Sequence, residues 1–348
     1  MVTVGRLLFP DYPSENSSDP NYVLLYMARA FDIELFLFEP KDVNYENKTI
    51  NGLFCEHGTV FRKVTPIPPL VDNHYTGIDE ELEKHTTLAR IYPGDTKFTT
   101  YTDLKNDGKY KDILIPTFLI EGYGDIKARL DEFNEVVIKP VLGAQGVGVI
   151  KLAKDGERYQ LVMGRESTYL SEQELSGYCN KNLSKDYILQ QYIDCRTRAG
   201  EPFDVRVSVV DMGWNQWTVT LYPRIGAAEG ILSNNSTGGY CIPIDYFLKK
   251  EFGDEWIKIR DDLLQFGREF PAHYRNLIQR EIFDLGIDIG ITQSDKGYKF
   301  WLFEANSMPP LDNHFAGGNI GINMLVAYFK YYHYLYSQMS EGRLRACP

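Results

Sequence analysis

Cysteine is scarce in this chain, and its few copies are isolated from one another. The five cysteines are odd in number and form no Cys-x-x-Cys pair; they are Cys55, Cys179, Cys195, Cys241 and Cys347. Structural zinc sites and disulfide frameworks are built from paired cysteines at characteristic spacings. The sequence therefore argues against both.

Basic charge and long apolar runs are also lacking. Lys and Arg total 37 against 48 Asp and Glu, a net charge of −11, and no basic run is long enough to follow a phosphodiester backbone. Nucleic acid is therefore not an expected partner. No uninterrupted apolar segment approaches the roughly 20 residues of a membrane span, and Pro10 and Asp11 interrupt the first apolar run before it could act as a secretory signal. These absences predict a soluble, cytoplasmic protein with no membrane partner.

A large apolar fraction is present, and it is patterned. The 348 residues are 43% hydrophobic and 14% aromatic, which is enough for a sizeable core and two or three domains. Residues 3–9, 21–30 and 33–38 have the character of strand, helix and strand, an order typical of a parallel α/β unit. We predict an α/β (α+β) protein with domains at 1–92, 93–188 and 189–348.

Other segments carry local signals of their own. Residues 50–55 and 59–64 are rich in β-forming residues around a short glycine-bearing turn, which predicts a hairpin. We expect a helix over 77–90 and two more within 254–283. The Tyr-rich segment 320–336 predicts an amphipathic helix whose aromatic stripe serves core or interface packing.

A lysine and a glycine-rich connection share the stretch 136–150. Apolar residues lie on both sides of Lys139, so its ammonium would be costly to bury without an anionic partner. Gly143, Gly146 and Gly148 fall within six positions, where side chains would block a ligand from backbone N–H groups. This combination suits a polyphosphate, although the glycines match neither the common phosphate loop nor a dinucleotide fingerprint. The alternative is a tight hairpin whose lysine extends to solvent.

Acidic side chains alternate with apolar ones in two later segments. In 285–291 the large apolar residues occupy odd positions, so Asp288 stands alone on the opposite face of the predicted strand. The same alternation in 300–306 puts Glu304 and Asn306 on one face.

The two acidic segments predict one hairpin. Asp295-Lys296-Gly297 suits a three-residue turn with Gly297 in the left-handed conformation, and this register sets Asp288 opposite Glu304. The two carboxylates and the Asn306 amide oxygen form a hard oxygen set that suits Mg²⁺ bridging phosphates. The alternative is a pair of strand-end acids facing solvent. Because facing carboxylates without a counter-ion destabilise a sheet, the sequence favours the site.

Two arginines lie on predicted strands between these elements. Arg206 ends the triplet Asp204-Val205-Arg206, and Arg224 lies at the end of the next strand. The planar guanidinium suits phosphoryl or acyl-phosphate oxygens. Taken singly, each arginine would be assigned to the surface. Together with Lys97, Lys139 and the carboxylates, they indicate one charged cleft.

This ordered set resembles the ATP-grasp superfamily over most of residues 90–310. Order, spacing and residue type match together, which makes the resemblance specific. Two N-terminal segments, 35–38 and 61–68, look like the YheC/YheD-type family associated with endospore coats. The residues that carry the superfamily resemblance are Lys97, Lys139, Gly143-Ala144-Gln145-Gly146-Val147-Gly148, Gln190-Gln191-Tyr192-Ile193, Asp204-Val205-Arg206, Arg224, Asn235, Asp288 and Glu304-Ala305-Asn306.

The resemblance implies an ATP-grasp fold, in which an N-terminal α/β domain precedes two subdomains that grip ATP. The two lysines would contact the phosphates, the glycine loop would close over them, and backbone groups at 191–193 would bind the adenine edge. The superfamily more often has an acidic residue at the position of Gln191, so a side-chain contact there does not carry over. The implied nucleotide-binding residues are Lys97, Lys139, Gly143, Gln145, Gly146, Gly148, Gln190, Gln191, Tyr192, Ile193 and, at the ribose, Asp194.

The resemblance also implies catalytic and metal-binding roles. Two arginines and an asparagine would steady the transferring phosphoryl group and line the acyl-phosphate pocket, and two carboxylates with an amide would hold Mg²⁺. The catalytic set is Arg206, Arg224 and Asn235, and the metal set is Asp288, Glu304 and Asn306.

The implied activity is that of an ATP-dependent carboxylate–amine ligase. A carboxylate would attack the γ-phosphoryl of ATP, and an amine would capture the acyl-phosphate, with release of ADP and phosphate. The partners would be small-molecule carboxylates and amines, such as amino acids or peptides; a carrier-protein acceptor and a homodimer are left open. Two alternatives also stay open: a spore-coat-type structural or assembly protein that keeps the fold without turnover, and a phosphotransferase that stops at a phosphorylated product.

Overall fold

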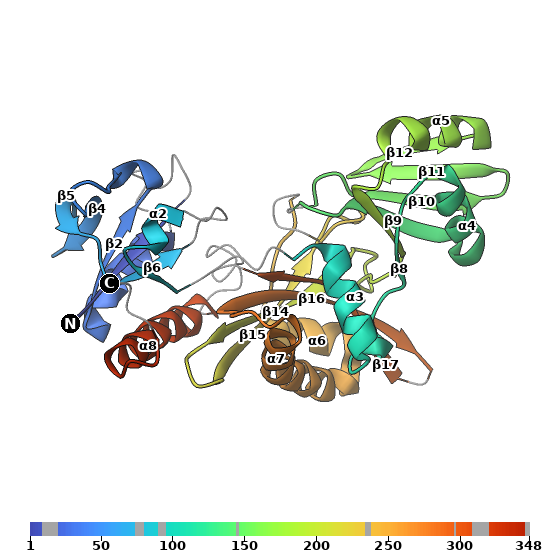
Figure 1. Ribbon diagram of the computed structural model, residues 1–348. Helices are drawn as coiled ribbons and strands as arrows, with labels where there is room; N and C mark the ends of the chain where they lie inside the picture. Colours follow the sequence, from blue (N-terminus) through green and yellow to red (C-terminus); the bar gives the residue numbers. More distant parts are fainter. Residues whose placement is uncertain are drawn as a thin grey trace.

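The computed structural model describes residues 1–8, 20–73, 80–89, 95–143, 146–233, 238–295, 297–307 and 320–344. Over these residues three β-sheets follow one another along the chain, and in space the third lies between the first and the second (Figure 1). The mixture of helices and strands agrees with the predicted α/β (α+β) class.

The first sheet is built around the predicted parallel strand–helix–strand unit. β1 (Val2–Leu7) pairs in parallel with β2 (Ile33–Phe38), and α1 (Pro20–Ala28) connects them. The predicted hairpin forms between β4 (Thr49–Glu56) and β5 (Thr59–Pro66). The sheet order is β3-β4-β2-β1-β6-β7. The remaining elements of this part are η1 (Arg29–Phe31), η2 (Pro40–Asp42), β3 (Val43–Asn44), β6 (Leu70–Asn73), α2 (Glu80–Glu83) and β7 (Thr87–Leu88).

The helix expected over 77–90 is wrong for the part of that segment that the structure describes. Only the four residues of α2 are helical, and the strand β7 follows them. Thr87 pairs in parallel with Leu70 of β6. Two successive threonines favour a strand because β-branched side chains lose rotational freedom in a helix. Pairing with the sheet therefore outweighs the helical pattern.

The second sheet carries Lys139. It is antiparallel, in the order β12-β11-β10-β9-β13-β8. The helices α4 and α5 cover one face through a core that includes Ile138 and Leu175, so Lys139 points to the other face. The elements of this part are α3 (Lys97–Asp107), η3 (Lys111–Ile113), β8 (Thr117–Leu119), α4 (Tyr123–Phe133), β9 (Glu135–Pro140), β10 (Ile150–Asp155), β11 (Arg158–Met163), β12 (Glu166–Leu170), α5 (Glu172–Asn182) and β13 (Tyr187–Gln191).

The third sheet carries the acidic hairpin. Its order is β15-β14-β16-β17, and α6 and α7 pack on one face. Two helices were expected within 254–283, but only α7 lies there; the other, α6, precedes it because Gly253 takes a positive φ of 58° and ends it. The elements are β14 (Phe203–Asp211), β15 (Trp217–Ile225), α6 (Ile244–Phe252), η5 (Gly253–Glu255), α7 (Trp256–Ile278), β16 (Asp284–Ser294) and β17 (Gly297–Ser307).

The Tyr-rich C-terminal helix packs as predicted. In α8 (Ile320–Ser340), Tyr328, Phe329 and Tyr332 are fully buried in the core of the first sheet, together with Val210 of β14. The last helix of the chain therefore joins the first sheet to the third (Figure 1). None of the described helices is long and apolar enough to cross a bilayer.

A fully buried ion pair fastens α8 to the first sheet. Arg6 of β1 and Asp72 of β6 have no exposed surface, and Arg6 Nη1 donates to Asp72 Oδ2. The Tyr332 hydroxyl donates to the same oxygen at 2.5 Å, and Arg6 Nε donates to Asn21 of α1 at 2.8 Å. One ion pair therefore links two strands and two helices.

We expect Asp72→Asn to lower the free energy of unfolding by about 3–5 kcal/mol, because Arg6 would remain buried without its counter-charge. Tyr332→Phe removes one hydrogen bond and should cost about 1 kcal/mol. Urea unfolding followed by tryptophan fluorescence measures both changes. Trp214 reports on α8 because its ring lies 4.6 Å from that of Tyr334.

The matched control is Glu56→Gln. It breaks the ion pair with Arg29, in which both side chains are 44% exposed, and should change the free energy of unfolding by less than about 1 kcal/mol. An effect of Asp72→Asn no larger than this control would contradict the assignment.

Candidate active site

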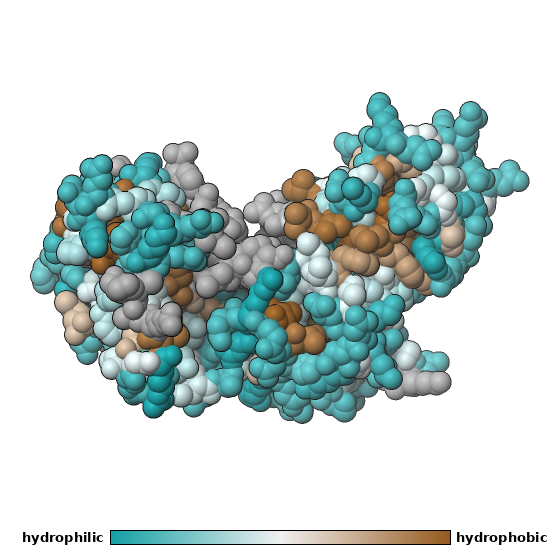
Figure 2. Space-filling model, in the orientation of Figure 1, coloured by the Kyte–Doolittle hydropathy of each residue, from teal (hydrophilic) through white to brown (hydrophobic). Residues whose placement is uncertain are grey.

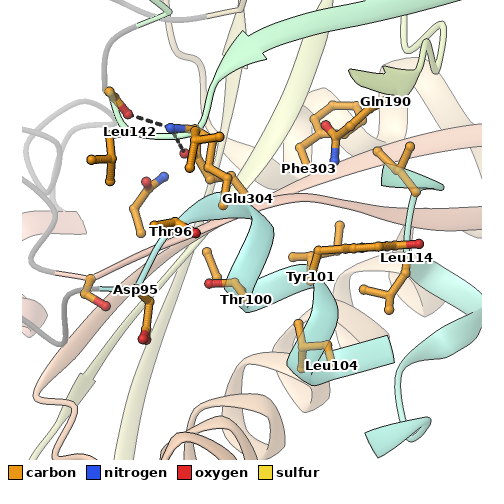
Figure 3. A pocket seen from close by; sticks show the side chains of 18 residues that line it. Asp95, Thr96, Thr100, Tyr101, Leu104, Leu114, Leu142, Gln190, Phe303 and Glu304 are labelled. Carbon is orange, nitrogen blue, oxygen red and sulfur yellow. Dashed lines mark hydrogen bonds and ion pairs between the residues drawn. The ribbon is translucent and has the colours of Figure 1, made fainter. Parts of the chain in front are cut away.

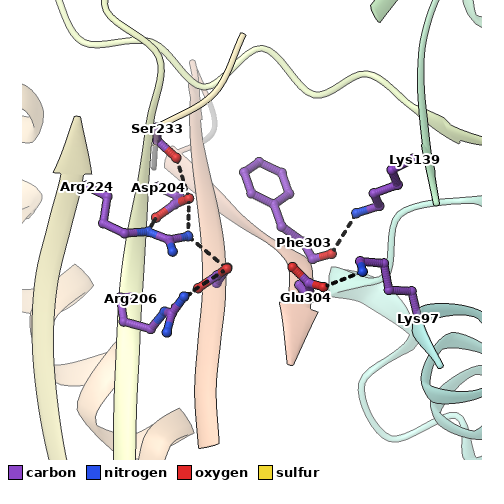
Figure 4. A network of polar contacts seen from close by, with 9 residues as sticks. Lys97, Lys139, Asp204, Arg206, Arg224, Ser233, Phe303 and Glu304 are labelled. Carbon is purple, nitrogen blue, oxygen red and sulfur yellow. Dashed lines mark hydrogen bonds and ion pairs between the residues drawn. The ribbon is translucent and has the colours of Figure 1, made fainter. Parts of the chain in front are cut away.

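Side chains from the two later sheets meet in the space between them (Figure 4). Thr96 caps α3 and thereby fixes Lys97 at its first turn. Lys97 Nζ lies 3.1 Å from Glu304 Oε1 and donates to the Gly143 carbonyl at 2.6 Å. Lys139 Nζ donates to the carbonyl oxygen of Phe303 at 3.2 Å. Both predicted lysines thus contact the strand that carries the predicted metal ligand.

The acidic hairpin has the predicted central register. Asp288 pairs directly with Glu304. The turn is shorter than expected, because Ser294 pairs with Gly297 and only two residues link the strands. Gly297 has the expected positive φ, 109°. Lys296 lies outside the described residues.

Strict alternation along 300–306 is wrong, because β17 contains a β-bulge. Asp288 pairs with Glu304, but the next residue, Ile289, pairs with Leu302, so Phe303 is the extra residue. The bulge changes the phase of the strand. Leu302 is therefore buried in the core with α6 and α7, whereas Glu304 faces the second sheet. The Phe303 carbonyl at the bulge accepts the bond from Lys139.

The bulge at Phe303 depends on the absence of a side chain at Gly290. A Cβ at this position would lie 2.4 Å from Cζ of Phe303 and 2.8 Å from Sγ of Cys195. The Phe303 ring therefore lies directly over the backbone of β16, and a larger residue would displace it. Glycine at position 290 is required by this close approach.

A chain of four buried charges crosses the third sheet. Arg206 lies directly opposite Asp288, and Asp204 lies opposite Arg224. Arg224 binds Asp204 through two nitrogens, at 2.7 and 2.6 Å, and reaches Asp288 at 2.8 Å. Arg206 Nε donates to Asp288 at 2.5 Å. All four residues are more than nine-tenths buried, and the two positive and two negative charges neutralise one another.

Burial and neighbouring charges shift the pKa values of Asp288, Arg224 and Lys139 in opposite directions. Burial alone would raise the pKa of Asp288, but Arg206 and Arg224 hold it below its ordinary value. Burial alone would lower the pKa of Arg224, but the two aspartates raise it well above its ordinary value. For Lys139 burial prevails and lowers the pKa, with Lys97 acting in the same direction against the carboxylates. An added anion would therefore offset the desolvation of the Lys139 ammonium.

Asp204 is a site residue to which sequence reasoning assigned no role. It holds the guanidinium of Arg224, and the Ser233 hydroxyl donates to it at 2.5 Å (Figure 4). A signal was available, because Asp204 and Arg206 are two residues apart on a strand and must share a face. A buried strand with two opposite charges on one face indicates a polar network.

The predicted metal ligands lie together on one face. Asp288 and Glu304 are cross-strand neighbours, and Asn306 pairs with Gly286, one alternation further along. Among the residues that the structure describes, no three His, Cys, Asp or Glu side chains form a metal site by themselves. Two carboxylates and an amide, one oxygen from each, would leave about half of the octahedral positions around Mg²⁺ to phosphate and water oxygens. Asp288 already accepts from both arginines and Glu304 pairs with Lys97, so this set would hold a cation once Glu304 has left Lys97.

A small cavity adjoins Lys97 (Figure 3). It measures about 100 Å³ and is lined by Thr100 and Tyr101 of α3, by Leu142, and by Phe303 with its neighbours on β17. Ligand pockets usually measure roughly 300–1,000 Å³, so this cavity accommodates only part of a nucleotide. In Figure 2 apolar residues gather where the second sheet approaches the third. The outer surface of the part that holds the second sheet is hydrophilic.

The predicted adenine-binding segment begins in the last two residues of β13 and continues beyond it. Gln190 lines the cavity and donates to Thr117 at 2.7 Å. The Tyr192 hydroxyl donates to Asp194 at 3.1 Å, and Lys151 lies 3.8 Å from the centre of the Tyr192 ring.

Two backbone amides of this segment are already paired. Those of Gln191 and Tyr192 donate to the carbonyls of Pro116 and Glu135. An adenine edge would therefore meet carbonyl groups or the amide of Ile193.

The glycine loop has the backbone that only glycine adopts easily. Gly143, Gly146 and Gly148 have positive φ angles of 141°, 77° and 75°. The Gly143 carbonyl already accepts a bond from Lys97, which places the start of this loop at the site. Gln145 of the loop and the predicted catalytic residue Asn235 lie outside the described residues.

We expect Gly290→Ala to destabilise the protein by about 1–3 kcal/mol, because the added methyl group would displace the Phe303 ring and strain the bulge. Gly177→Ala is the matched control: in α5 the added Cβ meets nothing within 4 Å, and it should stabilise the helix by roughly 0.5–1 kcal/mol. Thermal unfolding compares the two variants. Equal effects of both would contradict the packing assigned to Gly290.

Comparison with known proteins identifies relatives over most of the chain. The model of the YheC/D-like ATP-grasp family matches residues 92–335. Endospore coat-associated protein YheC of Bacillus subtilis (strain 168) is 23% identical over 329 residues, and the match covers 89% of each chain. The same organism's YheD, also an endospore coat-associated protein, is 25% identical over 296 residues; this match covers 79% of the present chain but only 64% of YheD.

Solved structures with a similar fold are ligases and synthetases. D-cycloserine synthetase DcsG has a TM-score of 0.56 at 13% identity, over 95% of this chain and 99% of its own. ATP-grasp ligase PsnB, complexed with a phosphomimetic variant of its minimal precursor, Mg and ADP, has a TM-score of 0.54 at 13% identity, over 95% and 99%. D-alanyl-alanine synthetase A from Vibrio cholerae O1 biovar eltor str. N16961 has a TM-score of 0.51 at 12% identity, over 94% and 98%.

These likenesses show the fold, and the predicted ATP-grasp fold is confirmed. The family model spans well over half of the chain, so the predicted relationship to the YheC/D type is confirmed as well. This protein belongs to the YheC/D-like ATP-grasp family.

Proposed function

We propose that this protein is an ATP-dependent ligase that activates a carboxylate as an acyl-phosphate and transfers the acyl group to an amine. The observation that carries the proposal is the meeting of Lys97 and Lys139 with the bulged strand that bears Glu304. Two cations on one side and an oxygen-rich metal face on the other are what a magnesium-bound triphosphate requires.

The contacts of the two lysines suggest how a nucleotide enters. Lys97 now binds Glu304 and the Gly143 carbonyl, and Lys139 binds only a neutral carbonyl among the contacts described. Phosphate oxygens would replace these acceptors and offset the desolvation of the half-buried Lys139. Glu304 would then be released to join Asp288 and Asn306 around Mg²⁺.

The remaining nucleotide contacts follow from position. We assign the glycine loop, with Gln145, to the phosphates and Gln190–Ile193 to the adenine edge. Asp194 is assigned to the ribose, because its side chain is 60% exposed next to that segment.

The proposed reaction has two steps. An oxygen of the substrate carboxylate attacks the γ-phosphorus of ATP, the bond from that phosphorus to the bridging oxygen breaks, and ADP leaves. The amine nitrogen then attacks the acyl carbon, the carbon–oxygen bond to phosphate breaks, and the amine proton leaves with the phosphate. Arg206 and Arg224 stabilise the charge on the transferring group, and Asn235 lines the acyl-phosphate pocket. Because this reaction depends on positioning and charge neutralisation, it needs no side-chain nucleophile.

Two structural neighbours suggest a substrate class to propose. PsnB is an ATP-grasp ligase whose structures hold a precursor peptide, and the Vibrio enzyme is a D-alanyl-alanine synthetase. We infer an amino acid or a peptide as one substrate of the present chain. The relatives YheC and YheD are endospore coat-associated, which makes a coat peptide or coat precursor a reasonable acceptor to test.

Hydroxylamine trapping tests the reaction without knowledge of the amine. Purified protein is incubated with MgATP, hydroxylamine and pools of amino acids and short peptides. An acyl-phosphate yields a hydroxamate together with ADP, and both are measured. We expect hydroxamate from at least one acid pool and none without ATP.

Lys139→Ala should weaken binding of MgADP by roughly 10- to 100-fold, since it removes a charge-assisted phosphate contact. Calorimetry measures the affinity. Lys154→Ala is the matched control. Lys154 lies on the next strand and pairs with Asp131 of α4, on the far face of the sheet. The affinity of this variant for MgADP should therefore equal that of the unaltered protein. Equal affinities in all three proteins would refute the assigned site.

Two other outcomes would favour other functions. Tight nucleotide binding without ADP formation under any acceptor would support a structural coat-type protein that keeps the fold without turnover. ADP formation with a stable phosphorylated product, and no hydroxamate, would support a phosphotransferase.

A further inference from the structure

Arg196 connects the adenine segment to a distant loop. It follows the ribose candidate Asp194 by two residues, and its Nε donates to Asp194 Oδ1 at 3.1 Å. Its Nη1 donates to the carbonyls of Gly200 and Ala228 at 2.6 and 2.9 Å, and its Nη2 to the carbonyl of Gly230 at 3.2 Å. All three guanidinium nitrogens are therefore used, and two of them bind a segment more than 30 residues away.

The segment held by Arg196 begins the loop that follows β15. Backbone bonds between Ile225 and Tyr240, at 2.9 and 2.8 Å, close the loop at its base. Gly226 lies so close to the Leu232 carbonyl that a Cβ there would be 1.9 Å from its oxygen, so the described part, 226–233, folds back on itself. We name this part the anchor segment.

The anchor segment has a second attachment, in the buried charge chain. The Ser233 hydroxyl at its end donates to Asp204 at 2.5 Å, and Asp204 holds Arg224 through two hydrogen bonds. The far side of the same loop meets the second sheet, because a Cβ at Gly238 would lie 3.2 Å from Nη2 of Arg165. One loop is thus bound to the adenine segment and, through Asp204, to the arginine assigned to the phosphoryl group, and its far side lies close to Arg165 of the opposite wall.

We propose that Arg196 is a positioning residue that transmits nucleotide binding to the anchor segment and so orders the side of the site that receives the carboxylate. The inference rests on the proposed nucleotide site. Asp194 is the only charged acceptor of Arg196 among its described contacts; the other acceptors are carbonyls. A ribose held by Asp194 fixes that carboxylate, the carboxylate fixes the guanidinium, and the guanidinium fixes Ala228 and Gly230.

An arginine is suited to this role because its five donors project from one rigid plane. A lysine would offer one nitrogen to acceptors that lie in several directions. Arg196→Lys should therefore restore the charge near Asp194 but only part of the hold on the anchor segment. Couplings between sites of this kind usually change affinity or local opening by about 5- to 150-fold.

Hydrogen exchange of the anchor segment, measured with and without the Mg²⁺ complex of a non-hydrolysable ATP analogue, tests the proposal. In the unaltered protein we expect the analogue to slow exchange in 226–233 by at least about 5-fold. Arg196→Gln should still bind the analogue at saturating concentration, but the protection of this segment should be lost. Arg196→Lys should show an intermediate protection.

Arg198→Gln is the matched control. Arg198 lies two residues further along the same turn and is exposed, so nucleotide-dependent protection should equal that of the unaltered protein. Exchange in the buried strand β14 should be unchanged in all variants, which separates positioning from a general loss of structure.

The outcomes distinguish the inference from the proposed function. If the unaltered protein fails to bind the analogue, the proposed function is overturned, and the inference with it. If the analogue binds but leaves the anchor segment unprotected, or protects it equally in Arg196→Gln, the inference alone is overturned. Loss of protection in Arg196→Gln, with analogue still bound and Arg198→Gln unaffected, supports it.

Discussion

The buried charge chain of the third sheet is the constraint on which the rest of the site depends. Arg206 and Asp288 are cross-strand neighbours, as are Asp204 and Arg224, so the pairing of three strands decides whether the charges meet. A slip of one residue would turn each charge toward the apolar core with α6 and α7. An unpaired buried charge is strongly destabilising. The same four residues therefore set the sheet register and the polarity of the cleft.

The β-bulge at Phe303 solves a conflict that this register creates on the edge strand. Leu302 must stay in the core, while Glu304 and Asn306 must face the second sheet, and a regular strand would put all three on one side. The extra residue changes the phase between them. It also presents a backbone carbonyl to Lys139, so the irregularity that preserves the core provides a contact across the cleft.

The sequence predicts those parts of the site in which side chains alternate regularly along a strand. Alternation in 285–291 sets Asp288 opposite Glu304 correctly, because β16 is regular and buried on one face. It cannot reveal the bulge, since an inserted residue is chosen by packing against Gly290 and Cys195. Asp204 was named in its motif but given no role, because its partner, Arg224, is twenty residues away and is known only once the strands pair. The helix expected over 77–90 failed because pairing with β6 decided the structure of Thr87.

The charges in the cleft help to distinguish a protein that binds a nucleotide for catalysis from one that serves only as a structural coat component. Buried ion networks are often no more stabilising than apolar side chains of similar volume, so the four charges inside the third sheet specify its register rather than add net stability. Lys139 adds a further cost, because burial lowers its pKa. Phosphate oxygens would offset that cost, and Mg²⁺ would occupy the oxygen face beside it. The four charges of the third sheet compensate one another without a ligand, so the physical argument for a nucleotide site rests on Lys139, whose described contact is a neutral carbonyl.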